Sequence, residues 1–474
     1  MSQPTFYFYD LETTGFNPRE ARIMQFAGQR TTLDLEPVEE PHNYYIRLTE
    51  DILPDPDAIL LTGITPQKTL ADGISEAEFL SLFHQDIARP GTIFVGFNTI
   101  RFDDEFMRFL HYRNFYDPYE WQWQDGRSRW DLLDVVRMTR ALRPEGIKWP
   151  FDSNGQPSNR LELLTIANKL DHSNAHDALS DVNASIAVAK LIRAKQPKLF
   201  DFLLTLREKK KVAEFINTNQ LFLYTSGKYQ GEFEKTTAGA IIAKHPARQG
   251  MLVYDLRYDP EEFFGLTPKA LTEAWRRRAD DPGVRLPVKT LQFNHCPAVA
   301  PLSVLDEASQ LRLELPLDQI RKNYKKLTSQ PDFTEHLLAA LKILDEQQTS
   351  TLLDESNVDA RLYDGFFDDQ DRSKMRLVRT TKPNELSTLD VEFSDERLSA
   401  LLPLYKARNY PKVLNDKDRA IWEKFKEHKL LGGNTESWIA RYFARLKELR
   451  TRTDLSDNAR YLLEELELYG QSIL

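Results

Sequence analysis

The stretch TFYFYDLETTG, residues 5–15, begins with an apolar, β-rich run and then carries two carboxylates one residue apart. Side chains of a strand alternate between its two faces, so Asp10 and Glu12 point to the same side. Two anions on one face repel each other, and folding would not choose that arrangement for stability. If further carboxylates converge there, the pattern predicts a divalent-metal site of the kind that hydrolyses phosphodiesters.

Length and composition indicate a soluble protein of several domains. A chain of 474 residues is too long for one ordinary hydrophobic core and predicts two to four domains. Its 41% apolar and 28% charged residues are typical of soluble globular proteins. The N-terminal residues MSQP contain no basic region leading into an apolar stretch, and no run approaches the roughly 18 apolar residues of a membrane span. We therefore expect a cytoplasmic protein that does not enter a membrane.

Cysteine content and net charge narrow the possibilities further. The single cysteine, Cys296, excludes an intramolecular disulfide framework and a cysteine-based zinc site, which fits a reducing compartment. The net charge of −9 does not exclude a nucleic-acid partner, because binding depends on where Lys and Arg lie. An acidic metal site beside local basic patches would also give a negative total.

The order of predicted elements divides the chain into three parts. In roughly the first 190 residues, strands expected at 5–10, 25–32, 44–48 and 93–98 are interrupted by a helical stretch that reaches residue 88, which predicts an α/β sheet with an antiparallel part. From about 198 to 350, short strands separated by Gly and Pro turns, with helices at 268–278 and 331–346, indicate a small, partly open barrel carrying helices. After about 352, apolar residues follow the helical period.

Two later motifs bring further carboxylates towards the first pair. Asp103 follows the strand expected at 93–98, and a strand-to-helix junction lies at the edge where α/β folds bind ligands, although an aspartate there is more often a helix cap. Asp181 lies in a helix where its neighbours one turn away are Ala or Ser, so the helix can approach the sheet closely. His176 stands five residues earlier, near the start of that helix.

Together, Asp-x-Glu, Asn-x-x-x-Phe-Asp and His-x-x-x-x-Asp, in this order, resemble the DEDDh exonuclease superfamily. Further segments resemble the bacterial exonuclease I family more closely and extend over nearly the whole chain. These segments are RFDDE at 101–105, YRNFYDPY at 112–119, SRWDLLD at 128–134, ALRPEG at 141–146, HSNAHDA at 172–178, NVDA at 357–360 and YKARNYP at 405–411. The four carboxylates and the histidine show no departure from the family pattern.

The resemblance implies both a fold and an activity. The fold is an RNase H-like mixed-sheet exonuclease domain at 5–192, followed by an SH3-like domain at 197–349 and a helical domain at 352–474. The activity is processive 3′→5′ hydrolysis of single-stranded DNA to 5′-mononucleotides, in the service of DNA repair and recombination.

The resemblance also assigns the catalytic roles. Two Mg²⁺ ions, or Mn²⁺, would be held by four carboxylates, and hard oxygen ligands favour these ions. The ligands would be Asp10, Glu12, Asp103 and Asp181. Glu12 would also contact the substrate. His176 would be the general base, since an ordinary histidine pKa near 6.5 suits proton transfer at neutral pH.

Residues 101–143 are the expected path of the DNA strand, because they contain eight Arg, no Lys and ten aromatic residues. Arg binds phosphate bidentately, and aromatic rings stack on unpaired bases without regard to sequence. Half or more of the rings are expected to be core, so the phenylalanines are assigned to packing and the predicted contacts are Tyr119, Trp123, Arg108 and Arg137. The family resemblance supports Arg160 as a further phosphate contact.

The family resemblance also implies a protein partner. Exonuclease I proteins form a clamp over single-stranded DNA and bind the acidic C-terminal tail of single-stranded DNA-binding protein through basic pockets. Arg143 is the candidate contact for that tail by motif match. Clusters of Lys and Arg at 209–211, 276–278 and 321–326 could line the DNA groove or could be solvated helix faces. We expect a monomer.

Two other functions compete with this interpretation. A DEDDh RNase or a polymerase-proofreading exonuclease usually needs little more than the first 190 residues, so the remaining 280 or so favour the DNA-specific enzyme. A catalytically silent binding module predicts the loss of at least one carboxylate or of the histidine, and all five are present.

Overall fold

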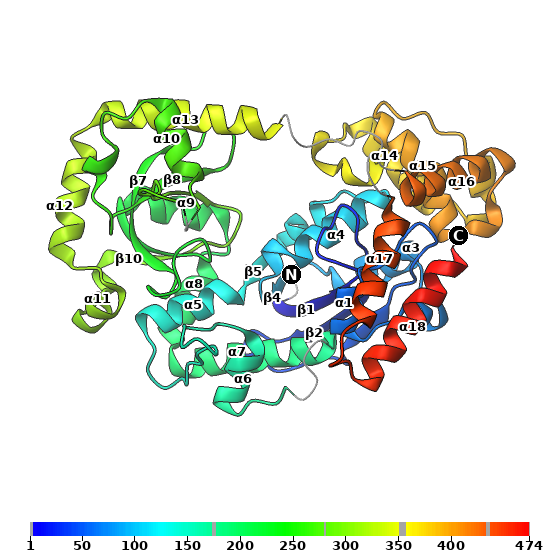
Figure 1. Cartoon of the computed structure of the whole chain (residues 1–474), viewed down its shortest axis with the longest axis horizontal. Coiled ribbons are helices and arrows are strands. Elements are labelled where there is room, and N and C mark those ends of the chain that lie inside the picture. Colours follow the sequence, from blue (N-terminus) through cyan, green and yellow to red (C-terminus); the bar gives the residue numbers. More distant parts are fainter. Residues whose placement is uncertain (1–2, 173–176, 279–280, 350–356, 433–436, 474) are drawn as a thin grey trace. The chain divides into compact units, whose positions relative to one another are not determined.

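The computed structural model of this chain describes residues 3–172, 177–278, 281–349, 357–432 and 437–473 (Figure 1). Its contacts divide the chain into two compact units. The first unit combines Met1–Arg129, His172–Ser185 and Asp354–Leu474. The second unit combines Trp130–Asp171 and Ile186–Leu353.

A mixed five-stranded sheet forms the centre of the first unit. Its strands are β1 (Thr5–Thr13), β2 (Ile23–Thr31), β3 (His42–Tyr45), β4 (Thr92–Gly96) and β5 (Ser128–Asp131), in the order β3-β2-β1-β4-β5. β1 pairs antiparallel with β2 and parallel with β4, so the predicted α/β sheet with an antiparallel part is confirmed. β1 extends three residues beyond its predicted end, and Glu12 therefore lies within the strand.

The helical stretch expected before residue 88 is broken into short helices. These are α1 (Pro56–Thr62), α2 (Pro66–Asp72) and α3 (Glu76–Leu82), followed by a π-helical turn at Phe83–Ile87. Gly63 ends α1 with a φ of 70°, a backbone conformation that favours glycine. Thr65 and Ser75 begin α2 and α3, because each side chain accepts a hydrogen bond from a backbone N–H in the first turn.

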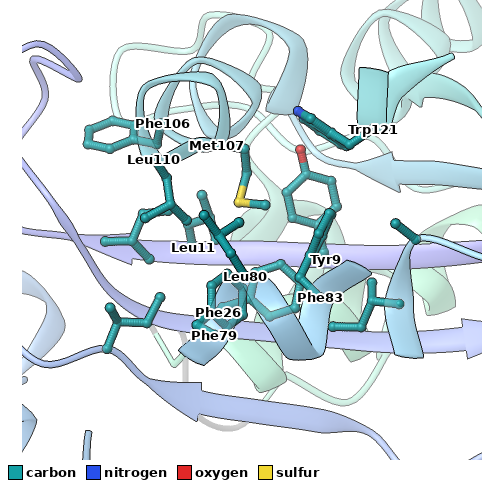
Figure 2. Close-up of a cluster of buried hydrophobic side chains, with 14 of the residues drawn as sticks. Tyr9, Leu11, Phe26, Phe79, Leu80, Phe83, Phe106, Met107, Leu110 and Trp121 are labelled. Carbon is teal, nitrogen blue, oxygen red and sulfur yellow. The ribbon is translucent and has the colours of Figure 1, made fainter. Parts of the chain in front are cut away.

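Helices α3 and α4 (Asp103–Arg113) contribute side chains to a buried cluster beside the sheet (Figure 2). Tyr9 and Leu11 of β1 belong to this cluster together with Phe26 of β2. Neighbours along a strand face opposite ways, so burial of Tyr9 and Leu11 directs Asp10 and Glu12 to the other face of the sheet. The hydrophobic pattern thus decides on which face the two carboxylates lie.

The C-terminal segment of the first unit is helical, as predicted. Its helices are α14 (Asp369–Thr380), α15 (Glu396–Asn409), α16 (Asp416–Leu431), α17 (Trp438–Arg450) and α18 (Asp457–Ser472). They share two buried clusters with the N-terminal part of the unit. In one, Phe109 and Tyr112 pack with Leu401 and Tyr405, and in the other Met24 packs with residues of α17 and α18. The two ends of the sequence therefore share hydrophobic cores.

A buried ion-pair network also joins these segments. Arg408 Nη2 lies 2.8 Å from Asp51 Oδ2 and 2.6 Å from Asp359 Oδ2, and Arg22 Nη2 lies 2.7 Å from Asp359 Oδ2. Lys429 Nζ lies 2.8 Å from Asp51 Oδ2. Burial alone would raise the pKa of Asp51 and Asp359, but the surrounding cations, Arg408 above all, hold the pKa of both carboxyls below the usual value. Both aspartates are therefore ionised at neutral pH.

This network anchors the turn that follows β1. The Thr14 N–H donates to the Arg22 carbonyl oxygen at 2.8 Å, and the Arg22 N–H donates to Thr14 Oγ1 at 2.8 Å. Thr14 lies two residues after Glu12, so the position of the Arg22 guanidinium on Asp359 helps to fix the end of the strand that carries Glu12.

The second unit is built around an antiparallel five-stranded sheet. Its strands are β6 (Leu221–Thr225), β7 (Thr236–Lys244), β8 (Gly250–Asp255), β9 (Val288–Gln292) and β10 (Ala298–Pro301), in the order β10-β6-β7-β8-β9. Its helices are α5 (Leu132–Leu142), α6 (Leu161–Asn168), α8 (Pro197–Thr205), α9 (Lys209–Thr218), α10 (Pro268–Arg276), α11 (Glu307–Leu313), α12 (Leu317–Thr328) and α13 (Pro331–Thr349). α7 (Ala178–Lys195) begins in the first unit and ends in the second.

The predicted strands of the second unit and the helices expected at 268–278 and 331–346 are present, and the structure adds one strand and the helices α8, α9, α11 and α12. β10 adds a strand that pairs antiparallel with β6 and was not anticipated. Its four residues, AVAP, are too short a run for a strand pattern to be recognised. Across the described part of the chain, no helix is both long enough and apolar enough to cross a membrane.

Candidate active site

Asp10 and Glu12 lie in the middle strand of the first sheet. In the register with β2, Asp10 faces Ala27 and Glu12 faces Gln25, so only one of the opposed side chains is large. Glu12 is 8% exposed and Asp10 is half-buried. Both carboxylates are therefore at least partly removed from water, and neither faces a basic side chain of β2.

Asp103 reaches the same region through a tight turn after β4. Asn98 adopts a left-handed conformation with a φ of 73°, and a short 3₁₀ turn at Thr99–Arg101 leads into α4. Asp103 is the first residue of α4 and is 4% exposed. Its charge raises the pKa of Asp10, so its carboxyl lies within electrostatic reach of the strand pair.

Asp104, next to Asp103, fixes the start of α4. Its carboxylate accepts a hydrogen bond from the Tyr9 hydroxyl and forms an ion pair with Arg129. Asp104 is 1% exposed, so these contacts compensate a buried charge. Because Tyr9 precedes Asp10 in β1, Asp104 ties the helix that presents Asp103 to the strand that presents Asp10.

Asp181 comes from the first turn of α7. Ala178 and Ala184 are fully buried and Ser185 is nearly so, which agrees with the predicted close approach of this helix. His172 Nε2 lies 2.6 Å from Asp181 Oδ1, and the imidazole is 2% exposed. Asp181 is thus oriented by a buried histidine that precedes the helix.

Asp10, Glu12 and Asp181 form a compact cluster of oxygen donors. One oxygen from each carboxyl lies within 4.8 Å of the others. Burial, followed by repulsion from Asp103, Asp181 and Asp177, raises the pKa of Asp10 well above its usual value. Burial and repulsion from Asp10 and Asp181 raise the pKa of Glu12 to about 9. This cluster holds excess negative charge that a cation would stabilise.

The donor set fits a hard divalent cation. Carboxylate oxygens are the ligands that Mg²⁺ and Mn²⁺ prefer, and the three described donors include neither a thiolate nor an imidazole. The raised pKa values indicate that, without a cation, at least one carboxyl holds a proton at neutral pH. Cation binding would therefore displace protons from the cluster.

Three residues near this cluster were missed by the sequence analysis. His172 is nine residues from Asp181, a spacing that helical periodicity cannot detect. Asp177 accepts a hydrogen bond from Gln25 Nε2 at 3.1 Å and raises the pKa of both strand carboxyls. Gln25 could have been anticipated, since it faces Glu12 in the register of the sheet. His176, the predicted base, lies outside the described residues.

The residues predicted to contact DNA differ in how accessible they are. In the first unit, Trp123 is 62% exposed, whereas Tyr119 is half-buried and Arg108 is 8% exposed. Arg108 forms an ion pair with Glu105, and its Nη2 donates to Gln122 Oε1 at 3.1 Å. Its guanidinium lies 5.6 Å from the centre of the Tyr119 ring, so Arg108 supports Tyr119 from within the protein.

The remaining predicted contacts belong to the second unit. Arg137 Nη1 lies 2.6 Å from Asp134 Oδ1, and its side chain is 15% exposed. Arg160 is exposed and directly precedes α6. Arg143 is half-buried; its Nη2 donates to the Val304 carbonyl oxygen at 3.0 Å and its Nη1 lies 3.5 Å from Asp306 Oδ2. Arg137 and Arg143 therefore already have acidic partners, whereas Arg160 points to solvent.

Most aromatic side chains of residues 101–143 are core, as the packing interpretation predicted. Six are at most 1% exposed: Phe106, Phe109, Tyr112, Phe115, Trp121 and Trp130. An exposed ring close in sequence to the carboxylates was missed. Phe16 is 71% exposed, its ring centre lies 6.4 Å from that of Phe102, and it follows Glu12 by four residues. Phe102 directly precedes Asp103. The two rings therefore belong to the segments that carry Glu12 and Asp103.

A carboxylate cluster on the middle strand of such a mixed sheet is the arrangement of a metal-dependent nuclease. A family model described as exonuclease matches residues 7–189. Two further models, the exonuclease I SH3-like domain and the exonuclease I C-terminal domain, match residues 207–342 and 356–473.

Similarity to known proteins covers most of the chain. Exodeoxyribonuclease I of Escherichia coli is 42% identical over 425 residues, which are 89% of this chain and 88% of that protein. The crystal structure of E. coli exonuclease I with a dA16 oligonucleotide matches with a TM-score of 0.94 at 38% identity, covering 100% of both chains. The chain therefore belongs to the exonuclease I family.

Two further solved structures are also similar over 100% of both chains. One is a zinc-bound form of the complex of E. coli exonuclease I with single-stranded DNA, with a TM-score of 0.93 and 38% identity. The other is a structure of SSB and exonuclease I in complex with an inhibitor, with a TM-score of 0.89 and 37% identity.

Proposed function

We propose that this chain hydrolyses single-stranded DNA processively from its 3′ end and releases 5′-mononucleotides. The observation that carries this conclusion is the match over the whole chain to exonuclease I bound to an oligonucleotide, combined with the cluster of three carboxylates on the matching sheet. The match extends beyond the part that an RNase or a proofreading exonuclease would need. Degradation of single strands in DNA repair and recombination is the corresponding cellular role, and we place it in the cytoplasm.

The divalent-metal site consists of Asp10, Glu12, Asp103 and Asp181. The first, second and fourth of these supply the compact donor cluster, and Asp103 supplies charge from the start of α4. Four carboxylates balance the charge of two divalent ions, and we propose two Mg²⁺, with Mn²⁺ as an alternative. The ions supply the Lewis acidity that phosphodiester hydrolysis requires. The zinc-bound E. coli complex supports a divalent site in this family.

Two histidines have different roles at this site. His176 is the general base that takes the proton from the attacking water, as the His-x-x-x-x-Asp motif indicates. His172 is a positioning residue, because its imidazole is buried against Asp181. Glu12, the most buried member of the donor cluster, also contacts the terminal nucleotide.

The DNA strand contacts exposed aromatic and basic side chains. Trp123 and Tyr119 stack on bases, with Arg108 supporting Tyr119. Arg160 contacts phosphate through its exposed guanidinium. Arg137 contacts phosphate only if its hydrogen bond to Asp134 is exchanged for one to the strand.

A protein partner of this chain is the acidic C-terminal tail of single-stranded DNA-binding protein. The similar structure of SSB and exonuclease I supports this partner. Arg143 is the proposed contact, and an acidic tail would take the place of Asp306 beside its guanidinium. We propose that the enzyme acts as a monomer divided into an exonuclease domain at 5–192, an SH3-like domain at 197–349 and a helical domain at 352–474.

A single degradation assay tests the function. A 5′-labelled single strand, the same strand in a blunt duplex, and the same sequence as RNA are incubated with Mg²⁺ and with EDTA. We expect stepwise shortening of the single-stranded DNA in Mg²⁺ alone. Equal degradation of the duplex, or a preference for RNA, would refute the substrate assignment, and activity in EDTA would refute the metal requirement.

The variant Asp181→Asn tests the site. It removes one negative charge while keeping the shape of the side chain, so hydrolysis should fall by several orders of magnitude while strand binding is largely retained. Normal turnover in this variant would show that the ligand assignment is wrong. Asp171→Asn, at an exposed position ahead of α7 in the sequence, is the matched control and should leave turnover unchanged.

A further inference from the structure

A second candidate site is a polar cavity of about 430 Å³ in the first unit, formed between helix α3 and helices α14 and α15. Two guanidinium groups, Arg47 and Arg379, line it together with the rings of Tyr116, Tyr405 and Tyr410. Glu78 supplies the one acidic side chain among the lining residues. The volume is within the range of about 300–1,000 Å³ that is typical of small-molecule sites.

Arg379 is the unusual residue of this cavity. All fully buried arginines of the first unit lie against carboxylates: Arg22, Arg30, Arg108, Arg113, Arg397 and Arg408. The half-buried Arg379 has no carboxylate within ion-pair distance among the described residues. A guanidinium that is partly removed from water is stabilised by an anionic partner. Because Arg379 lines the cavity, an anion bound there would supply that partner.

The contacts of Arg379 hold it in place without neutralising it. Its guanidinium lies 4.0 Å from the centre of the Tyr116 ring, and its Nε donates to the Met375 carbonyl oxygen at 3.4 Å. The Tyr116 ring also stacks on His84, with ring centres 4.4 Å apart and planes 2° apart. Burial lowers the pKa of His84 to about 3, so this imidazole is neutral and supplies no counter-charge. The guanidinium therefore lies against an aromatic stack that carries no counter-charge.

The second cation and the hydroxyl groups indicate what kind of anion fits. Arg47 is exposed, and its Nη2 donates to the Gly73 carbonyl oxygen at 2.8 Å, which keeps further N–H donors available. Guanidinium groups bind the oxygens of phosphate bidentately, and two of them balance a dianion better than a monoanion. Serine and tyrosine hydroxyls around the cavity can donate to the remaining oxygens.

We propose that this cavity binds the phosphomonoester dianion of a small molecule, with Arg379 as the principal contact and Arg47 as the second. Inorganic phosphate and a nucleoside 5′-monophosphate share this chemistry. A nucleoside 5′-monophosphate would be the product of the proposed nuclease activity. The inference depends on the proposed function only for this ligand. The cavity is separate from the carboxylate cluster, because none of its lining residues belongs to that cluster.

Calorimetric titration of the full chain in EDTA tests the proposal, with phosphate and thymidine 5′-monophosphate as separate ligands at constant ionic strength. EDTA keeps divalent ions from bridging phosphate to the carboxylate cluster. We expect saturable binding at millimolar or lower concentrations. Equal affinity for both ligands would identify the phosphate group as the feature that is bound, and tighter binding of the nucleotide would identify the product.

Arg379→Gln should weaken phosphate binding about tenfold or more, which corresponds to about 1.4 kcal/mol. Arg376→Gln, one turn away on α14 and exposed, makes the same charge change and should alter affinity less than about twofold. If Arg379→Gln fails to fold, Arg47→Gln at the exposed rim should still weaken binding several-fold. Absence of saturable binding to the wild-type chain, or an equal loss in Arg376→Gln, would overturn the proposal.

The test also separates this proposal from the proposed function. Binding is measured without metal and without hydrolysis, so a chain that failed to degrade DNA could still bind phosphate. Conversely, an active nuclease that bound neither ligand in EDTA would retain the proposed function and lose this inference.

Discussion

The variant Glu12→Gln should be more stable than the wild-type protein when no metal is bound, and less stable than the wild-type protein when metal is bound. Burial, Asp10 and Asp181 raise the pKa of Glu12 from 4.5 to about 9 in the folded chain. A raised folded-state pKa means that the stability contributed by this carboxyl is fully present below about pH 4.5 and is lost as pH rises towards about 9. Glutamine does not titrate and therefore avoids this loss.

The magnitude follows from the distance between the working pH and the ordinary pKa. At pH 7 the folded state keeps the Glu12 carboxyl protonated, whereas the unfolded chain would release that proton. This pH is about 2.5 units above the ordinary pKa of 4.5. At about 1.36 kcal/mol per unit, the cost is about 3 kcal/mol. Glu12→Gln should thus be more stable than wild type by about 3 kcal/mol near pH 7 in EDTA, and by less than about 1 kcal/mol near pH 5.

Metal should reverse the order of stability. A cation that binds only the folded state adds about 4.1 kcal/mol when its concentration is 1,000 times the dissociation constant, which exceeds the cost of about 3 kcal/mol. Wild type receives this stabilisation in full, whereas Glu12→Gln has lost a ligand and receives less. The same linkage predicts that Mg²⁺ raises the thermal midpoint of wild type more at pH 8 than at pH 6, because protons compete for the carboxylates.

Denaturant and thermal unfolding at several pH values, each in EDTA and in Mg²⁺, measure these differences. Glu20→Gln is the matched control, since Glu20 is exposed in the turn after β1 and should show neither effect. The reasoning fails if Glu12→Gln is no more stable than wild type in EDTA near pH 7, or if the gain is the same at pH 5 and pH 7.

Three further variants test individual contacts. His172→Ala removes the partner of Asp181 and should weaken Mn²⁺ binding by about 10–100-fold, measured by titration of the ion; unchanged affinity would exclude a positioning role. Asp359→Asn removes one of the two aspartates that face the buried guanidinium groups of Arg22 and Arg408, and it should cost about 3–5 kcal/mol in denaturant unfolding and also weaken Mn²⁺ binding. Asp418→Asn, in a buried pair with a single lysine, should cost stability alone. Phe16→Ala should weaken binding of single-stranded DNA by about 1–3 kcal/mol in fluorescence anisotropy, and an unchanged dissociation constant would contradict a stacking role.

The fold and part of the site could be predicted because they depend on short-range patterns. Alternation along β1 places Asp10 and Glu12 on one face, and the structure has that arrangement because Tyr9 and Leu11 are buried on the other. Small neighbours of Asp181 predicted the close approach of α7, and Ala178 and Ala184 are indeed fully buried. Each of these inferences needs only neighbours within one turn of a helix or two residues of a strand.

The parts that were missed depend on residues far apart in sequence. His172 orients Asp181 from nine residues earlier in the sequence, and no periodicity connects them. Sequence could not show that Arg108 is held by Glu105 and Gln122 inside the protein, because an arginine beside aromatic residues has the same local pattern whether it faces solvent or the core. The exposure of Phe16 is likewise a property of the folded surface.

The ion-pair network explains why the nuclease site depends on the end of the chain. Asp359 lies more than 300 residues after Arg22 and accepts its guanidinium at 2.7 Å, and Arg22 fixes Thr14 beyond the strand that carries Glu12. A buried cation that loses its anion is strongly destabilising, so removal of the C-terminal segment would affect the turn as well as the hydrophobic clusters. The helical segment is therefore part of the folding unit that forms the metal site, which gives a physical reason why the first 190 residues of this chain would not suffice as a nuclease.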